Sequence, residues 1–220
     1  MAPVLLFDLD GTLLNSDPIH EAVFRDLWAR HGMTLDDGFY MTHVHGRLNV
    51  DVFAEFLPDL PDPQALSDAK EAEFRRRLPA PYPATPGAAA LLDRAATRGW
   101  KRAVVTNAMR PNAEAMLAAT GLRHHFEVIV IGEECPRGKP DPYPYAQAMH
   151  LLGADPADCI AFEDSPSGVR SAAAAGARTI GIRSGLTDAQ LRAAGAVASI
   201  QDFNDPALEP LLGLPTGASA

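Results

Sequence analysis

Cysteine is scarce in this chain: only Cys135 and Cys159 occur, and no histidine or cysteine stands near them at zinc-site spacing. A disulfide framework and a structural zinc cluster are therefore excluded as the basis of the fold. We interpret both thiols as inert packing groups.

Positive charge is also in short supply. The 220 residues include 19 Lys and Arg against 28 Asp and Glu, which gives a formal net charge of -9. Such a field is unfavourable for a polyanion, so we expect neither nucleic acid nor a membrane surface as a partner. A small anion can still bind where a metal ion or a few convergent cations reverse the local sign.

The first apolar run of the sequence is short. This run, Val4 to Phe7, has no basic residue before it and is closed at once by Asp8. This pattern is neither a signal-peptide core nor a membrane span. We expect a cytoplasmic protein, either a monomer or a weak homo-oligomer.

What is present is an ordinary globular composition, with 47% hydrophobic and 21% charged residues. From residue 82 onward, strand-like apolar runs alternate with helical stretches that begin near a proline and end at a glycine. The expected strands are Val4 to Asp8, Lys101 to Thr106, Glu127 to Ile131, Asp158 to Glu163, Arg178 to Ile182 and Val197 to Ile200. The expected helices between them are Pro86 to Gly99, Pro111 to Gly121, Pro142 to Gly153 and Pro166 to Gly176. The alternation predicts an α/β fold, a parallel sheet with helices on both faces.

Residues 15–81 lack a comparable strand run and are predicted to be helical. A helix is expected to begin at Asp17, because its apolar residues Ile19, Val23, Phe24, Leu27 and Trp28 fall on one side at about 100° per residue. Further helical stretches follow at Val50 to Phe56 and Gln64 to Leu78. We therefore predict a core domain of residues 1–14 and 82–220, with a helical domain of residues 15–81 inserted after the first strand.

Asp8 and Asp10 come where the first buried strand ends, and the carboxyl edge of an open α/β sheet is where ligands bind. An ionised carboxylate can attack phosphorus, and a second acid can protonate the leaving alcohol and later take a proton from water. Gly11 permits a sharp turn that leaves backbone N–H groups facing a phosphate. By itself the Asp-x-Asp-Gly run also suits a plain turn or a calcium loop.

Three further segments follow later strands and are expected at the same edge. Thr106 and Asn107 offer a hydroxyl and an amide, and Lys139 offers a cation. Glu163 and Asp164 add oxygen ligands that suit magnesium. Four successive strands are thus followed, in chain order, by a pair of acids, by hydrogen-bond donors, by a cation and by a second pair of acids.

These four segments resemble the motifs of the haloacid dehalogenase superfamily, in the branch with a helical cap after the first strand. Order, spacing and insert position are similar to its beta-phosphoglucomutase, sugar-phosphate phosphatase and phosphoglycolate phosphatase group. The resemblance implies a Rossmann-like core, Mg²⁺ as cofactor and a small phosphate monoester as substrate. It also implies roles for the residues of the core motifs: Asp8 as nucleophile, Asp10 as acid/base and magnesium ligand through its backbone carbonyl, Lys139 as the stabilising cation, Thr106 and Asn107 as phosphate ligands, and Asp8, Asp164 and Glu163 as metal ligands.

Within the insert, His20, Arg47 and Arg76 are the candidate substrate-binding residues. His20 suits either a hydrogen-bonded histidine beside the core or, as in mutase-like relatives, a group at the cap hinge near Asp10. Arg76 is one of three consecutive arginines, which point in different directions on a helix, so most of that charge is a solvated face.

Several core residues also have a plain structural interpretation. Thr106 and Asn107 are placed to cap the next helix, and Asp141 and Ser165 are placed to cap the helices that follow them. Glu163 suits either direct metal ligation or the orientation of another ligand.

The predicted function is magnesium-dependent hydrolysis of a small phosphorylated metabolite through an aspartyl-phosphate. A phosphomutase shares every core residue and differs only in returning the phosphoryl group to a sugar. A hydrolytic dehalogenase has no use for Asp10, which counts against it. A catalytically silent phosphate-binding module ranks lowest, because no motif residue is missing.

Overall fold

The structure is a computed structural model that describes residues 2–45 and 47–213. Its contacts divide the chain into two compact units. The core unit comprises Met1–Asn15 and Pro81–Ala220, and the helical unit comprises Ser16–Ala80. Each is described separately below.

The core unit is built on a parallel sheet of six strands in the order β3-β2-β1-β4-β5-β6. The strands are β1 (Val4–Phe7), β2 (Arg102–Thr106), β3 (Val128–Ile131), β4 (Cys159–Glu163), β5 (Arg178–Ile182) and β6 (Ala198–Ile200). The predicted α/β parallel-sheet core is confirmed. Because β1 pairs with both β2 and β4, the direction of chain progression reverses beside it, and ligands of open α/β sheets bind at such a switch point.

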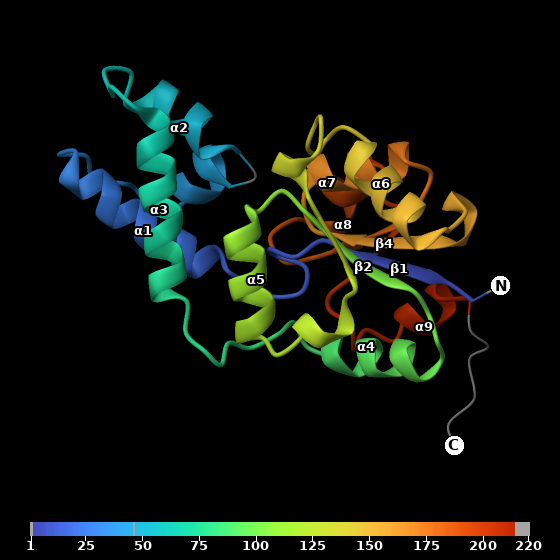
Figure 1. Ribbon diagram of the computed structural model, residues 1–220. Coiled ribbons are helices and arrows are strands. Elements are labelled where there is room, and N and C mark those ends of the chain that lie inside the picture. The colour runs from blue at the N-terminus through green and yellow to red at the C-terminus, as the bar shows by residue number, and fades with distance from the viewer. Residues whose placement is uncertain (1, 46, 214–220) are drawn as a thin grey trace. The chain divides into compact units, whose positions relative to one another are not determined.

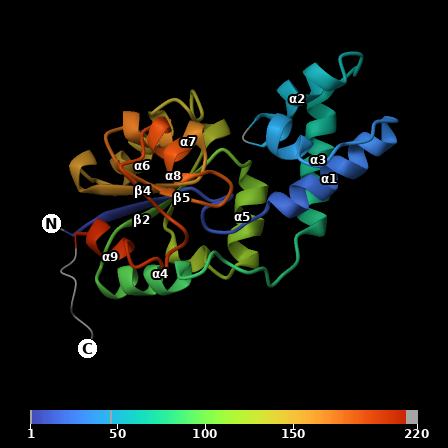
Figure 2. The ribbon, with the colours of Figure 1, turned by 180° about the vertical axis from the view of Figure 1, so that it is seen from behind.

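Helices cover both faces of this sheet. They are α4 (Ala88–Thr97), α5 (Arg110–Ala119), α6 (Tyr143–Leu152), α7 (Pro166–Ala174), α8 (Asp188–Ala194) and α9 (Leu208–Leu211), with short 3₁₀ turns at Arg123–His125, Gly132–Glu134 and Pro156–Asp158. Helices α6 and α7 lie on one face, and α4 and α9 lie on the opposite face (Figures 1 and 2). The sequence did not predict α8 or α9, which have only seven and four residues.

Both faces of β1 are buried, which explains its unbroken apolar run. On one face Leu6 packs with Tyr145 and Met149 of α6. On the other face the Phe7 ring stacks on Phe162 with centroids 5.0 Å apart. A fully buried side chain of this size contributes about 2 to 3 kcal/mol by leaving water, so the central strand is firmly anchored.

The two cysteines are free, as the sequence indicates. Cys159 lies in β4, and burial raises the pKa of its thiol to about 11. The thiol therefore stays protonated at neutral pH, which fits a packing role.

The helical unit contains α1 (Asp17–Arg30), α2 (Asn49–Phe56) and α3 (Pro63–Arg77). A π-helical turn at Tyr40–Val44 was not predicted from the sequence. Trp28 and Phe24 of α1 pack against Phe53 of α2, with ring centroids 5.6 and 6.0 Å away. No helix among the described residues is long and apolar enough to cross a membrane.

Candidate active site

The register of the sheet places the ends of three strands at one edge. Phe7 pairs with Val104 on one side and with Phe162 on the other. The residues that follow β1 and end β2 and β4 therefore emerge side by side. These are Asp8, Thr106 and Glu163, and all three are buried.

Lys139 forms hydrogen bonds to both acidic residues of this group, Asp8 and Glu163. It lies before α6, and its Nζ donates to Asp8 Oδ1 at 2.6 Å and to Glu163 Oε1 at 2.5 Å. Tyr145 Oη of α6 donates to the same Glu163 oxygen at 2.8 Å. One ammonium is thus held between two carboxylates that are 155 residues apart in the chain, Asp8 and Glu163 (163 − 8).

The electrostatics of this cluster follow from burial and charge. Burial raises the pKa of Asp8 to about 7, against the attraction of Lys139 and with a further rise from the negative charge of Glu163. Burial opposes the charged form of Lys139, but the attraction of Asp8 and Glu163 outweighs it and raises the pKa of the ammonium. Lys139 therefore stays charged, whereas Asp8 needs more positive charge nearby to be fully ionised at neutral pH.

Asp164 is positioned by a glycine and a serine. Gly11 has a φ of 75°, and a Cβ built on it would lie 1.9 Å from Asp164 Oδ2. Only glycine allows the turn after Asp10 to approach this carboxylate so closely. Asp164 Oδ2 also accepts a hydrogen bond of 3.0 Å from Ser184 Oγ.

The donor set suits a divalent cation. Asp8, Glu163 and Asp164 each offer a carboxylate oxygen, and these oxygens lie within 4.8 Å of one another. Hard oxygen ligands of this kind match magnesium. Three carboxylates against one ammonium also leave a local excess of negative charge that a divalent cation would offset. The side chains present therefore fit the expected Mg²⁺.

The turn that carries Asp10 is tightly bonded. Gly11 N–H donates to the Leu14 carbonyl at 2.8 Å, and Leu13 N–H donates to the Leu9 carbonyl at 2.8 Å. Asp10 itself is half-buried. The backbone around the predicted acid/base is thus fixed by local hydrogen bonds.

Thr106 and Asn107 do not cap the following helix, so that alternative is wrong. Helix α5 has Met109 at its N-cap position, with no side-chain cap. Thr106 Oγ1 instead accepts from the Ala108 N–H at 3.0 Å, and the Asn107 amide bonds to the backbone of Lys139. Their predicted role as phosphate ligands stays a prediction.

The predicted Ser165 cap of α7 is confirmed, whereas α6 has Pro142 at its N-cap position and no side-chain cap, so Asp141 only precedes that helix. Asp141 accepts a hydrogen bond of 2.9 Å from the Tyr143 N–H at the start of α6, and Ser165 accepts one of 3.1 Å from the Gly168 N–H in α7. Sequence reasoning missed Tyr145, which looks like any buried aromatic residue of a helix. It also missed Ser184, although the end of β5 belongs to the same sheet edge and was a detectable signal.

The candidate substrate residues of the helical unit all have partners inside that unit. His20 stacks on Phe74 with centroids 3.9 Å apart, and its Nδ1 lies 2.7 Å from Lys70 Nζ. Burial, followed by the charge of Lys70, lowers the pKa of His20 to about 3. His20 thus has hydrogen-bond and stacking partners within its own unit, as its plain structural interpretation expects, and its part in substrate binding stays a prediction.

The two arginines are exposed and paired. Arg47 donates to Glu55 Oε2 at 2.8 Å, and Arg76 donates to Glu73 Oε1 at 2.6 Å. Their part in substrate binding stays a prediction.

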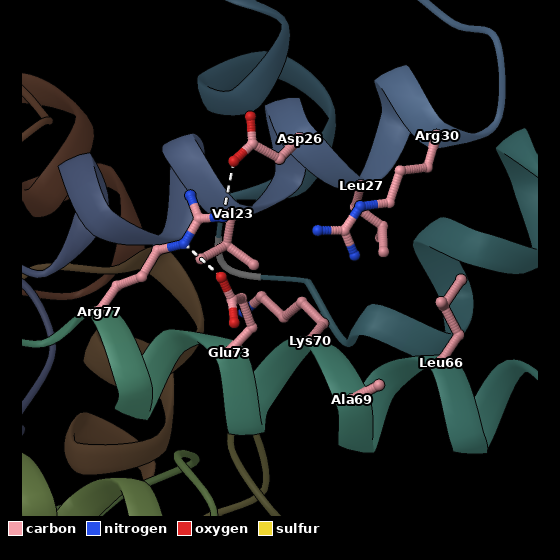
Figure 3. A pocket seen from close by; sticks show the side chains of 9 residues that line it. All are labelled: Val23, Asp26, Leu27, Arg30, Leu66, Ala69, Lys70, Glu73 and Arg77. Carbon is pink, nitrogen blue, oxygen red and sulfur yellow. Dashed lines mark hydrogen bonds and ion pairs between the residues drawn. The ribbon is translucent and has the colours of Figure 1, made fainter.

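A small groove also lies between α1 and α3 of the helical unit (Figure 3). Arg77 spans it and donates to Asp26 and Glu73, each at 2.6 Å. The bond from Arg77 to Asp26 joins α3 to α1 across the groove, and His20, Arg47 and Arg76 do not line it.

A buried group of carboxylates around one lysine, at the carboxyl edge of a parallel sheet, is typical of enzymes that transfer phosphoryl groups. A family model described as haloacid dehalogenase-like hydrolase matches residues 3–176. The chain belongs to this family and is a hydrolase of it.

Similar proteins span most of the chain. Protein CbbY of Rhodobacter capsulatus is 34% identical over 188 residues, covering 80% of this chain and 83% of the relative. Hexitol phosphatase A of Escherichia coli is 33% identical over 178 residues, covering 80% and 81%. A crystal structure of CbbY from Rhodobacter sphaeroides in complex with phosphate has a TM-score of 0.79 at 30% identity, covering 92% of this chain and 95% of that one.

Proposed function

We propose that this chain is a magnesium-dependent phosphatase that hydrolyses a small phosphorylated metabolite, a sugar phosphate or a phosphoglycolate-like acid, through an aspartyl-phosphate. That the chain is a phosphoric monoester hydrolase follows from its family and its phosphatase relatives. The observation that carries the finer proposal is the meeting of Asp8, Lys139, Glu163 and Asp164 at the switch point of the sheet.

In the proposed reaction an Asp8 carboxylate oxygen attacks phosphorus while the bond from phosphorus to the leaving alcohol breaks. Asp10 protonates the alcohol oxygen as it departs. Asp10 then takes a proton from water, which attacks the phosphorus of the aspartyl-phosphate, releases inorganic phosphate and restores Asp8. Each step displaces a group at phosphorus, and the two steps together return Asp8 and Asp10 to their starting states.

Lys139 is proposed to neutralise charge on the transferred phosphoryl group. Its ammonium is only 2.6 Å from Asp8 and stays charged, because two carboxylates hold it. Asp8, Asp164, Glu163 and the Asp10 backbone carbonyl are the proposed magnesium ligands. Bound Mg²⁺ supplies positive charge that favours ionised Asp8 and offsets the charge of the phosphate.

The substrate proposal rests on relatives rather than on a pocket. Hexitol phosphatase A is a phosphatase by name, and the CbbY structure contains phosphate. We propose that residues of the helical unit, with Arg47 and Arg76 as candidates, select among leaving alcohols.

The test is phosphate release from a panel of hexitol phosphates, ketose phosphates, phosphoglycolate and p-nitrophenyl phosphate. We expect release with Mg²⁺, none with EDTA, and recovery when Mg²⁺ is restored. Ca²⁺ should substitute badly, because its longer and looser coordination misplaces an in-line attack. Full activity in EDTA would exclude the magnesium proposal, and isomerised sugar phosphate without phosphate release would indicate a phosphomutase.

A further inference from the structure

The side chain of Asn107 is bonded to the backbone of a single residue, Lys139. Asn107 Oδ1 accepts from the Lys139 N–H at 3.0 Å, and Asn107 Nδ2 donates to the Lys139 carbonyl at 3.2 Å. Both polar atoms of the amide therefore contact the same residue, 32 positions further along the chain. Such a two-point contact fixes the position and the orientation of the Lys139 backbone.

The backbone of two glycines packs closely against this amide. A Cβ built on Gly132 would lie 2.2 Å from Asn107 Oδ1, and one built on Gly138 would lie 3.0 Å from it. The segment from Gly132 to Lys139 thus wraps closely around the amide. Glycine at both positions is what lets the backbone come so near.

The contact with the Lys139 backbone also affects the position of the ammonium at the end of the Lys139 side chain. Because the four-carbon stem of a lysine is flexible, its ammonium is held in one place only when both ends of the residue are fixed, and Asn107 fixes the backbone end. The Lys139 ammonium has to sit at hydrogen-bond distance from both Asp8 and Glu163. A small displacement of the reacting groups is enough to cost a large factor in rate.

We propose that Asn107 is a positioning residue, whose side chain places the Lys139 ammonium by clamping the Lys139 backbone and does not itself bind the phosphate. This inference rests on the proposed function, in which Lys139 stabilises the transferred phosphoryl group. It replaces the expected phosphate contact of the Asn107 side chain with an indirect action through the lysine.

The first test is a double-mutant cycle of Asn107→Ala, Lys139→Ala and the double variant. The observables are kcat for p-nitrophenyl phosphate and the Kd of inorganic phosphate with Mg²⁺. Asn107→Ala alone should lower kcat roughly 10- to 100-fold. In the Lys139→Ala background the same change should cost less than about 2-fold, because the group it positions is gone. Losses that multiply would show that the amide acts on phosphate directly and would overturn the proposal.

The second test is spectroscopic and needs no turnover. The chain has three lysines, Lys70, Lys101 and Lys139, so selective isotope labelling of lysine gives a spectrum in which the Lys139 ammonium is assigned with the Lys139→Ala variant. In Asn107→Ala without ligand, the Lys139 signal should shift or broaden while the other two stay in place. An unchanged Lys139 signal in a variant with reduced kcat would also overturn the proposal.

Gln190→Ala is the matched control. Gln190 is exposed, and its amide oxygen accepts from Thr187 N–H at 3.0 Å, so this variant also loses an amide and its local hydrogen bonds. It should leave kcat and the lysine spectrum unchanged. If Asn107→Ala melts too early to assay, Asn107→Ser carries both tests, since its short hydroxyl cannot make both contacts. Absence of phosphate release by the wild-type enzyme contradicts the proposed function, whereas an active wild type with multiplying losses contradicts the Asn107 proposal alone.

Discussion

Each unit of this protein buries a lysine, and the groups around the two lysines differ. In the core unit Lys139 lies among three carboxylates, those of Asp8, Glu163 and Asp164. In the helical unit Lys70 forms an ion pair of 2.8 Å with the carboxylate of Glu71. The first cluster has more carboxylates than ammonium groups, whereas in the second the ion pair that we describe matches one ammonium with one carboxylate.

The balance in the helical unit is completed by neutral groups. Lys70 Nζ pairs with Glu71 Oε1 and lies 2.7 Å from Nδ1 of His20, which its lowered pKa keeps neutral. Asn49 Nδ2 donates to the same Glu71 oxygen at 2.6 Å and to Ser67 Oγ at 3.1 Å. Such a network satisfies its own charges and serves the fold.

The comparison distinguishes buried charges that serve the reaction from buried charges that stabilise the fold. An uncompensated set of carboxylates costs free energy to bury and persists where a ligand supplies the missing charge. A compensated pair needs no ligand. Changes in the core cluster should therefore affect mainly activity, and changes in the helical cluster should affect mainly stability.

The largest effect is expected from Asp8→Asn, which removes the proposed nucleophile's charge without altering its shape. Phosphate release should fall at least roughly 10⁴-fold, while the circular dichroism spectrum stays that of the wild type. Asp93→Asn is the control, because that side chain is 73% exposed. Substantial turnover by the pure Asp8→Asn enzyme would refute the covalent mechanism.

Lys70→Met should break the balanced cluster by leaving Glu71 buried without its counter-charge. We expect a loss of about 3 to 5 kcal/mol in the free energy of unfolding. Urea unfolding followed by Trp28 fluorescence, in a Trp100→Phe background, reports on the helical unit because the chain has two tryptophans.

The exposed Lys101 supplies the control for that loss, and Lys101→Met should cost less than about 1 kcal/mol. Adding Glu71→Gln to Lys70→Met should recover part of the stability, because it removes the unpaired charge. No recovery would mean that packing, and not charge balance, accounts for the effect.

Gly11→Ala should disturb Asp164 directly, since the new Cβ would lie 1.9 Å from its Oδ2. We expect kcat/KM to fall about 100-fold and the Mg²⁺ requirement to rise. Gly121→Ala is a matched control with a similar φ of 72° but nothing within 4 Å of the new Cβ. Both variants share the backbone strain of roughly 1 to 2 kcal/mol, so an equal loss of activity would show that strain alone is responsible.

Acid should weaken the helical unit through His20. Because burial lowers the pKa of His20 from 6.5 to about 3, the unfolded chain takes up a proton between these values that the folded chain does not. The stability that neutral His20 gives is therefore present above pH 6.5 and lost as the pH falls from 6.5 toward 3. His45 has the opposite pH dependence. The hydrogen bond to Asp17 raises the pKa of His45, so the stability that protonated His45 contributes is lost as the pH rises above 6.5.

Unfolding free energies measured between these limits should fall less steeply toward acid in His20→Gln than in the wild type. The glutamine keeps an acceptor for Lys70 but cannot be protonated. His31→Gln, at an exposed position of the same unit, should leave the slope unchanged. Equal slopes in wild type and His20→Gln would contradict the assignment.

The smallest effect is expected at the surface of the helical unit. Arg47→Ala and Arg76→Ala should lower kcat/KM roughly 3- to 10-fold for a hexitol phosphate but hardly change it for p-nitrophenyl phosphate, which needs mainly the core. Arg25→Ala is the control, because Arg25 forms a comparable ion pair of 2.9 Å with Glu21. Equal losses on both substrates would argue against substrate selection by these arginines.

Local pattern was enough to find most of the fold. All six strands begin and end within one residue of the expected bounds, because buried parallel strands are short apolar runs closed by polar residues. The π-helical turn at Tyr40–Val44 and the short helices α8 and α9 were missed. Each spans too few residues to show a helical period.

The sequence by itself determined which chemical groups reach the edge of the sheet, since each of Asp8, Thr106, Lys139 and Asp164 follows or ends a strand. Only the tertiary structure decided what those groups touch. The Asn107 amide meets the backbone of Lys139, and Gly11 meets Asp164, across 32 and 153 positions of the chain (139 − 107 and 164 − 11). Such contacts depend on the register of paired strands and on the paths of the loops between them, and no local periodicity of the sequence encodes either.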